Sequence, residues 1–210
     1  MNAADLRELI KVWAELMAEN RDWLIELDSV VGNSDLGLTM SDGFRAAADA
    51  VRESEASDVG KTAYLAGKAM ASAVPSTMGT LMASGLMNAG KVLKNVEELD
   101  AKQEAAFFQA YFDGVKNRGK AELGEKTFLD GLYPAVQALW EGAETGLSPK
   151  KTAQQAASAA WRAFEDTKRL LAKHGRMAIR GEQSRGMLDP GAAVAALLMK
   201  GYAQFKADSE

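Results

Sequence analysis

The sequence predicts an all-α fold on three grounds. Apolar residues recur three and four positions apart, as they do on one face of an amphipathic helix. Ala, Leu, Met, Glu and Lys, which favour helices, outnumber the β-branched residues. The alternation of apolar and polar residues between turn signals, which is typical of a strand, appears nowhere in the chain. We therefore expect helices and no sheet.

The N-terminal part of the chain is predicted to hold three helices. Over residues 6–17 the apolar positions share one helical face, and Asn2 is placed to cap the start. A second helix covers residues 20–29 and ends in a loop that contains glycine. The third is expected to begin near Ser41, whose hydroxyl can accept hydrogen bonds from the first free amides. A loop of residues 27–40 is therefore expected between two helices.

The rest of the chain is predicted to be mostly helical, which gives eight or nine helices in all. Capping residues such as Asp100 and the Ser148-Pro149 pair mark helix starts. Two irregular segments, residues 117–126 and 174–189, interrupt the helices, and loops of that length tend to be functional or disordered. The further helices are expected over residues 58–73, 77–94, 99–117, 127–143, 149–173 and 190–207.

The helix expected over residues 77–94 is rich in glycine, alanine and serine. Glycine in particular lowers helix propensity, so such a composition needs something that packs closely against the backbone. We expect either a close helix contact or a nearby ligand there.

Length and composition indicate one globular domain over residues 1–210. Of the 210 residues, 47% are hydrophobic and 26% are charged. The net charge is −4, and Lys and Arg are spread along the chain, which argues against a nucleic-acid-binding protein. Cysteine is absent, so disulfides and thiolate metal sites are excluded. The N-terminus does not resemble a secretion signal, and the longest apolar stretch, residues 192–199, is too short to cross a bilayer. We expect a soluble, cytoplasmic protein without a membrane partner.

The loop between the second and third helices has the composition of a divalent-metal site. Magnesium is usually held by a few carboxylate oxygens together with substrate phosphates. Asp28, Asp35 and the amide oxygen of Asn33 could supply such ligands. Gly32 and Gly37 would let the backbone turn so that these groups converge. Spacing alone equally allows Asp35 to cap a turn and Asp28 to be a solvated residue at a helix end.

Other metal and phosphate sites fit the sequence poorly. A calcium loop of the EF-hand kind is excluded because Phe44 stands where the final glutamate is required. A single histidine rules out carboxylate-bridged di-iron sites and histidine-rich zinc sites. A Walker A loop is excluded because Glu55 occupies the position of its first glycine.

Phosphate could be bound at the start of the helix over residues 77–94. Ser76 and Thr77 open that helix, so their hydroxyls and the free amides would form an anion site, although an ordinary N-cap has the same sequence. Arginines in the segment of residues 174–189 could add planar donors to a phosphate or stay solvated. His174 stands at a predicted helix end, where histidines commonly cap carbonyls. We assign no catalytic nucleophile to this chain.

Four segments carry a family resemblance: LDSVVGNSDLGLTMSDGF, PSTMGTLMASG, RGKAELGEKTF and HGRMAIRGEQSRGMLDPGA. Together they resemble the nucleotide-binding L subunit of dihydroxyacetone kinase, which also occurs as the C-terminal domain of single-chain forms. They follow the family's order over residues 27–193. The resemblance implies an antiparallel barrel of about eight amphipathic helices, with ADP or ATP bound at one end through one or two magnesium ions.

The resemblance also implies roles for particular positions. Three aspartates of the family coordinate the metal, and the matching positions here are Asp28, Asn33 and Asp35. The positions expected to contact the nucleotide are Leu36, Gly37, Leu38, Thr39, Ser76, Thr77, Gly119, Phe128, Arg176, Asp189, Pro190 and Gly191.

The chain departs from the family at several of these positions. Asn33 stands where the family has the aspartate that bridges both metals, so one negative charge is lost and one metal site is expected to bind more weakly. Leu36 replaces a histidine, and Thr39 replaces an asparagine. The family's phosphate-binding Gly-Gly-Ala-Ser-Gly stretch is shortened, so the roles of Ser76 and Thr77 depend on a gapped alignment.

The resemblance implies a kinase subunit. Such a subunit passes a phosphoryl group from nucleotide to dihydroxyacetone, or a related short hydroxyketone, held on a histidine of a separate K subunit. The phosphoryl donor is either free ATP or a phosphotransferase-system protein that recharges bound ADP. We further expect a homodimer. The alternative is a catalytically weakened regulatory or interaction protein that keeps the fold and the nucleotide, and Asn33 is the position that decides between them.

Overall fold

The computed structural model describes residues 1–208 and confirms the all-α prediction. Within that range the chain forms nine α-helices, two 3₁₀-helices and no strand, apart from an isolated antiparallel bridge between Asn2 and Glu98. None of the described helices is both long and apolar enough to span a membrane. The elements are α1 (Ala3–Glu19), α2 (Arg21–Ser29), α3 (Leu36–Arg52), α4 (Val59–Ala73), α5 (Thr77–Val92), α6 (Ala101–Gly119), α7 (Phe128–Thr145), α8 (Pro149–Asp166), η1 (Thr167–Arg169), η2 (Arg176–Ser184) and α9 (Pro190–Asp208).

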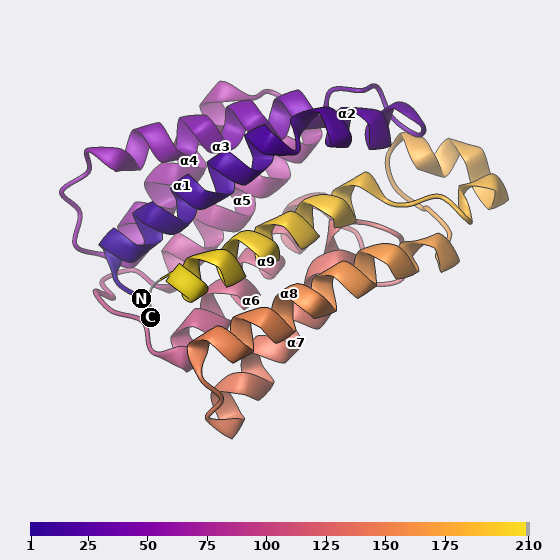
Figure 1. The fold of residues 1–210 in the computed structure, drawn as a ribbon. Coiled ribbons are helices and arrows are strands. Elements are labelled where there is room, and N and C mark those ends of the chain that lie inside the picture. Colours follow the sequence, from indigo (N-terminus) through magenta and orange to yellow (C-terminus); the bar gives the residue numbers. More distant parts are fainter. Residues whose placement is uncertain (209–210) are drawn as a thin grey trace.

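Eight of these α-helices form a closed ring in which each packs against its two neighbours. The order around the ring is α1, α3, α4, α5, α6, α7, α8 and α9, and α9 closes it by packing on α1. The short α2 packs mainly on α3. Figure 1 shows both termini together at one end, and α2 with residues 170–189 at the opposite end. This arrangement is the helical barrel that the resemblance implies.

Helices of the ring begin at the caps that the sequence predicts. Oδ1 of Asn2 accepts hydrogen bonds from the amides of Ala4 and Asp5 at 2.8 and 3.0 Å. Asp100 caps α6, and Ser148 caps α8 just before its proline. Each cap satisfies amides that have no partner within the helix. These predicted helix starts are confirmed.

Trp13 of α1 lies inside the ring and joins four helices. It is fully buried, and its Nε1 donates to the carbonyl oxygen of Leu198 in α9 at 2.8 Å. Its ring meets Phe44 of α3 and Phe108 of α6 nearly edge-on, with centroids 6.1 and 6.3 Å apart. Gly201 of α9 leaves room for the indole ring of Trp13, because a Cβ on Gly201 would lie 2.7 Å from the indole Cδ1.

Close helix contacts explain the small residues of α5. A Cβ on Gly90 would lie 2.5 Å from the carbonyl oxygen of Gly60 in α4, and a Cβ on Gly60 would lie 2.6 Å from that of Gly90. On the other side of α5, a Cβ on Gly85 would lie 2.5 Å from the ring of Tyr111 in α6. The sequence leaves open either a close helix contact or a nearby ligand, and these distances show that α5 packs closely against its neighbouring helices.

Three predicted boundaries are wrong. The helix α3 begins at Leu36 instead of near Ser41, which is buried within the helix. The helix expected over residues 149–173 ends as α8 at Asp166, and η1 follows it. The segment of residues 174–189 contains η2, which is broken at Gly181, where φ is 54°. This glycine permits the left-handed backbone that separates two short helical turns.

Gly90→Ala tests the close crossing of α4 and α5. Alanine has the higher helix propensity, worth about 1 kcal/mol in an open helix. Here its methyl group would collide with backbone atoms of Gly60 and Tyr64, so we expect the free energy of unfolding in urea to fall by about 2 kcal/mol. Ser72→Ala, at an exposed position of α4, is the control and should change that energy by less than about 0.5 kcal/mol. A Gly90→Ala variant as stable as the parent would contradict the close crossing.

Candidate functional site

A cavity of about 600 Å³ lies at the end of the ring that carries α2. Four helices, α3, α5, α7 and α9, begin at its wall, at Leu36, Thr77, Phe128 and Pro190. The first amides of a helix lack partners within it and carry partial positive charge. A cavity that collects four such helix starts favours an anion such as phosphate, and its volume suits a small-molecule ligand.

Asp28 lies in the last turn of α2 and holds the start of α3. The residue is buried, and its Oδ2 accepts hydrogen bonds from the amides of Asp35 at 3.1 Å and Leu36 at 3.4 Å. Gly32 makes room for this carboxylate, because a Cβ on Gly32 would lie 1.9 Å from Oδ1 of Asp28. Ser34 has a left-handed φ of 64° in the same tight loop. The loop is therefore folded around the carboxylate of Asp28.

Asn33 and Asp35 reach the same cavity as Asp28. Both residues are exposed, and Nδ2 of Asn33 donates to Oδ2 of Asp35 at 2.5 Å. In the described part of the chain, no three Asp, Glu, His or Cys side chains are grouped so that they could hold a metal. Two carboxylates and one amide fit a single magnesium ion that shares its coordination with phosphate better than they fit two adjacent ions.

Ser76 and Thr77 stand at the cavity where α5 begins. Oγ of Ser76 accepts a hydrogen bond from the amide of Gly79 at 3.0 Å, so Ser76 is the ordinary N-cap that the sequence allows. A hydroxyl can donate while it accepts, so this cap leaves the O–H of Ser76 able to bind an anion in the cavity. The two readings of Ser76 are therefore compatible.

Asp189 is buried at the start of α9. Its Oδ2 accepts from the amide of Ala192 at 2.7 Å, and its own amide donates to Oγ1 of Thr167 at 3.1 Å. Burial, reinforced by the charge of Asp130, raises the pKa of Asp189 to about 7, although the amide of Ala192 opposes the shift. The cavity thus contains a carboxyl group that changes charge near neutral pH.

Most of the predicted site residues line this one cavity. The three predicted positions that do not line it follow each other in α3. Gly37 packs against α2, because a Cβ there would lie 2.1 Å from the carbonyl oxygen of Arg21, while Leu38 is exposed and Thr39 is buried. That any of these residues binds nucleotide or metal stays a prediction. The predicted residues at the cavity are Asp28, Asn33, Asp35, Leu36, Ser76, Thr77, Gly119, Phe128, Arg176, Asp189, Pro190 and Gly191.

His174 also lines the cavity, and the prediction that it caps helix carbonyls is wrong. The preceding helix already ends at Asp166, and Nε2 of His174 lies 2.6 Å from Oε2 of Glu125. The amide of Glu122 and the imidazole of His174 hold the pKa of Glu125 down to about 2. His174 therefore ties residues 174–189 to the loop before α7.

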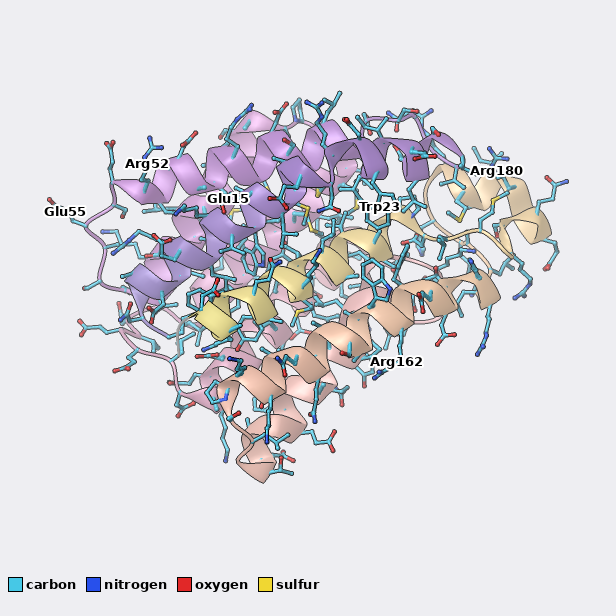
Figure 2. All side chains as sticks on the ribbon, in the orientation of Figure 1. Glu15, Trp23, Arg52, Glu55, Arg162 and Arg180 are labelled. Carbon is cyan, nitrogen blue, oxygen red and sulfur yellow. The ribbon has the colours of Figure 1, made fainter. Side chains whose placement is uncertain are left out.

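The arginines of residues 174–189 have different roles. Arg176 lines the cavity. Arg180, which Figure 2 shows at the end of the molecule where α2 lies, donates from Nη2 to the carbonyl oxygen of Val30 at 2.6 Å. Arg185 pairs with Glu182 at 2.8 Å. Of the three arginines, Arg176 is the one placed to meet a phosphate.

Lys126 lines the cavity and was not predicted from the sequence. It is 2% exposed, and its Nζ donates to the carbonyl oxygens of Ser184 at 2.5 Å and Leu170 at 3.3 Å. A lysine in a polar loop normally indicates a solvated side chain. Neither spacing nor charge pattern marks this one as buried, because both carbonyls come from residues far along the chain.

Sequence comparisons place the chain among known proteins. The family model described as the DAK2 domain matches residues 30–204. The chain is 34% identical over 94% of its length to an L-erythrulose 1-kinase of Mycolicibacterium smegmatis, of which it spans 35%. It is 32% identical to the ADP-binding subunit DhaL of the PEP-dependent dihydroxyacetone kinase 1 of Listeria innocua, with 91% of each chain covered. It is 30% identical to the corresponding Escherichia coli subunit, with 89% of each covered.

Structure comparisons agree on the fold. The crystal structure of the dihydroxyacetone kinase of C. freundii in its native form matches 97% of this chain and 34% of that chain, with a TM-score of 0.73 and 22% identity. The same kinase in complex with AMP-PNP and Mg²⁺ matches with a TM-score of 0.70 and 24% identity. At these identities the likeness shows the helical architecture alone.

The stability of the ligand-free protein should depend on pH through Asp189. Folded Asp189 keeps its proton up to a pKa of about 7, whereas an unfolded aspartate loses it near 3.8. Between these values the folded state binds more protons, so the free energy of unfolding falls as pH rises. Asp189→Asn, which keeps an acceptor for the amide of Ala192, should remove this contribution and flatten the profile by more than about 1 kcal/mol between pH 5 and 8.

Urea denaturation of both proteins at several pH values measures this contribution. Asp49→Asn, at an exposed position of α3, is the control and should leave the profile nearly unchanged. Parallel profiles for the parent and Asp189→Asn would show that Asp189 titrates normally in the folded protein.

Proposed function

The chain belongs to the DAK2 domain family, and from this premise we propose that it is the ADP- or ATP-binding subunit of a kinase for dihydroxyacetone or a related short hydroxyketone. The family resemblance drawn from the four sequence segments is thereby confirmed. One observation carries the proposal: the carboxylates of Asp28 and Asp35 and four helix starts line a single cavity. Carboxylates suit the metal and helix starts suit the phosphates of a magnesium-bound nucleotide.

The metal end of this site is the loop before α3. Asp28 and Asp35 would hold magnesium through their carboxylates, and Asn33 would add a neutral amide oxygen. When bound, magnesium neutralises phosphate charge and polarises the phosphoryl group. Asp28 can serve in this way without leaving its place, because it lines the cavity while its Oδ2 accepts from the first amides of α3.

The phosphate end of this site is the start of α5. The free amides at the start of α5, the hydroxyls of Ser76 and Thr77 and the guanidinium of Arg176 would bind the phosphate oxygens. Gly119 and Phe128, with the turn from Asp189 to Gly191, would bind the rest of the nucleotide, as the family resemblance implies. We propose this division of roles as part of the same hypothesis.

The rest of the enzyme is proposed to lie in a partner. The cavity contains carboxyl, amide, hydroxyl and cationic groups suited to hold and orient a phosphoryl group, which is most of what phosphoryl transfer requires. The hydroxyketone would be held on a histidine of a separate K subunit. Free ATP and a phosphotransferase-system protein are the two candidate phosphoryl donors. Relatives whose names say PEP-dependent or PTS-dependent support the phosphotransferase-system protein as a candidate. The homodimer, the single domain and the cytoplasmic location stay predictions.

Magnesium with ADP should raise the melting temperature of the protein, because a ligand that binds the folded state stabilises it. We expect a shift of several degrees at millimolar ADP that disappears when magnesium is chelated. Asp28→Asn should abolish most of the shift but keep the fold, because the amide oxygen still accepts from α3. Asp42→Asn, a half-buried carboxylate elsewhere on α3, is the matched control and should behave like the parent. A parent protein that shows no shift at millimolar ADP with magnesium would overturn the proposed site.

Asn33→Asp discriminates an active kinase subunit from a nucleotide-holding regulatory protein. The additional carboxylate restores the charge that a second ion requires, so we expect tighter magnesium binding in a calorimetric titration of the ADP complex. Each chain is then combined with a K subunit, and hydroxyketone phosphorylation is measured. If the parent is active, the hypothesis that the chain is an active kinase subunit is supported. If the Asn33→Asp variant alone is active, the parent is a nucleotide holder that has lost catalysis.

A further inference from the structure

Residues 170–189, called here the covering segment, form one wall of the cavity. His174, Arg176 and Met177 are among the residues that line it. The segment leaves the ring after η1 and rejoins it at α9. Its middle projects outward, since Ile179 is 87% exposed. Movement of such a wall depends on the contacts that hold its two ends.

The ammonium group of Lys126 holds both ends of the covering segment. Its Nζ donates to the carbonyl oxygen of Leu170, near one end, at 3.3 Å and to that of Ser184, near the other, at 2.5 Å. The ends also bind each other, because Oγ of Ser184 accepts from the amide of Ala172 at 3.1 Å. Lys126 thus fixes both ends of the covering segment, which are also bonded to each other, to the loop just before α7.

Glu125, the residue before Lys126, makes further contacts with the covering segment. The carbonyl oxygen of Glu125 accepts from the amide of Lys173 at 3.2 Å, and its carboxylate meets His174 at 2.6 Å. Lys126 itself has a left-handed φ of 62°, which disfavours every residue except glycine and, to a lesser degree, Asn and Asp. A lysine at a position where glycine would be unstrained indicates that its side chain is needed there.

Stability alone does not account for this lysine. Its hydrogen bonds go to two neutral carbonyl groups, and burial lowers its pKa although the charge of Asp189 opposes the shift. Buried charges seldom stabilise a fold more than an apolar side chain of similar size would. A role in the site therefore explains the placement of Lys126 better than a role in folding.

We propose that Lys126 is a positioning residue that keeps the covering segment closed over bound nucleotide and so sets the rate at which nucleotide leaves. The inference rests on the proposed function of the cavity. Through Leu170 and Ser184, the ammonium group fixes the backbone that carries Arg176 and leads into Asp189. Lys126 acts on the nucleotide through these residues and not by direct contact.

Lys126→Met tests the proposal, because methionine has a similar length and no donor. The dissociation rate of a fluorescent ADP analogue is measured with magnesium by displacement with unlabelled ADP. We expect release to become about tenfold faster or more, since two hydrogen bonds from a charged donor are lost. Lys168→Met, an exposed lysine beside the covering segment, is the matched control and should release the analogue at the parent's rate. Lys126→Arg, which keeps the cation and its donors, should restore slow release.

Hydrogen exchange of the ligand-free proteins tests the anchoring separately. Amides of residues 170–189 should exchange faster in Lys126→Met than in Lys168→Met, with the helices of the ring unchanged. If Lys126→Met does not fold, Ser184→Ala takes its place, because it loosens the same anchor by removing the bond to the amide of Ala172 and should also speed release.

The outcomes separate this inference from the proposed function. If the parent does not bind the ADP analogue with magnesium, the proposed function fails. If the parent binds it and a folded Lys126→Met, or Ser184→Ala in its place, releases it at the parent's rate, the inference is overturned while the function stands. Faster release in the variant, slow release in Lys126→Arg and an unchanged control support the inference.

Discussion

The site depends on the closure of the helical ring, which brings alternate helix starts to one end. Because successive helices run in opposite directions around the ring, α3, α5, α7 and α9 all begin beside α2, where Figure 1 also shows residues 170–189. Packing alone therefore gathers four helix starts, with their partial positive charge, around a cavity before any specific ligand contact is considered. Trp13 supports this geometry by joining four helices inside the ring, and Gly60 and Gly90 support it by letting α4 and α5 approach closely.

The carboxylate of Asp28 couples that geometry to the proposed chemistry. It is fixed by the first amides of α3, so the helix start that it caps also orients it toward the cavity. Buried Asp189, which also lines the cavity, caps α9, and its raised pKa of about 7 limits the negative charge that the cavity presents near neutral pH. Lys126 ties the covering segment to the start of α7. Each element of the proposed site is thus attached to the start of a ring helix.

The sequence predicted those features that depend on local chemistry. Asn2, Asp100 and Ser148 cap the helices that they were expected to cap, and the loop residues Asp28 and Asp35 meet at one cavity. Prediction from the sequence failed where a residue's contacts come from a distant segment or from another helix. The start of α3 was misplaced because its cap comes from the end of α2, and the burial of Lys126 and the raised pKa of Asp189 arise from segments that meet only in the folded chain.

In the proposed site, the loop before α3 binds a metal and the start of α5 binds the phosphates of one nucleotide. A crystal grown with ADP and with manganese in place of magnesium would test both assignments, because manganese can be located by its anomalous scattering. We expect an anomalous peak beside the carboxylates of Asp28 and Asp35, with the phosphates of ADP extending from it toward Ser76 and Thr77. A nucleotide bound elsewhere, or a metal peak away from this loop, would contradict it.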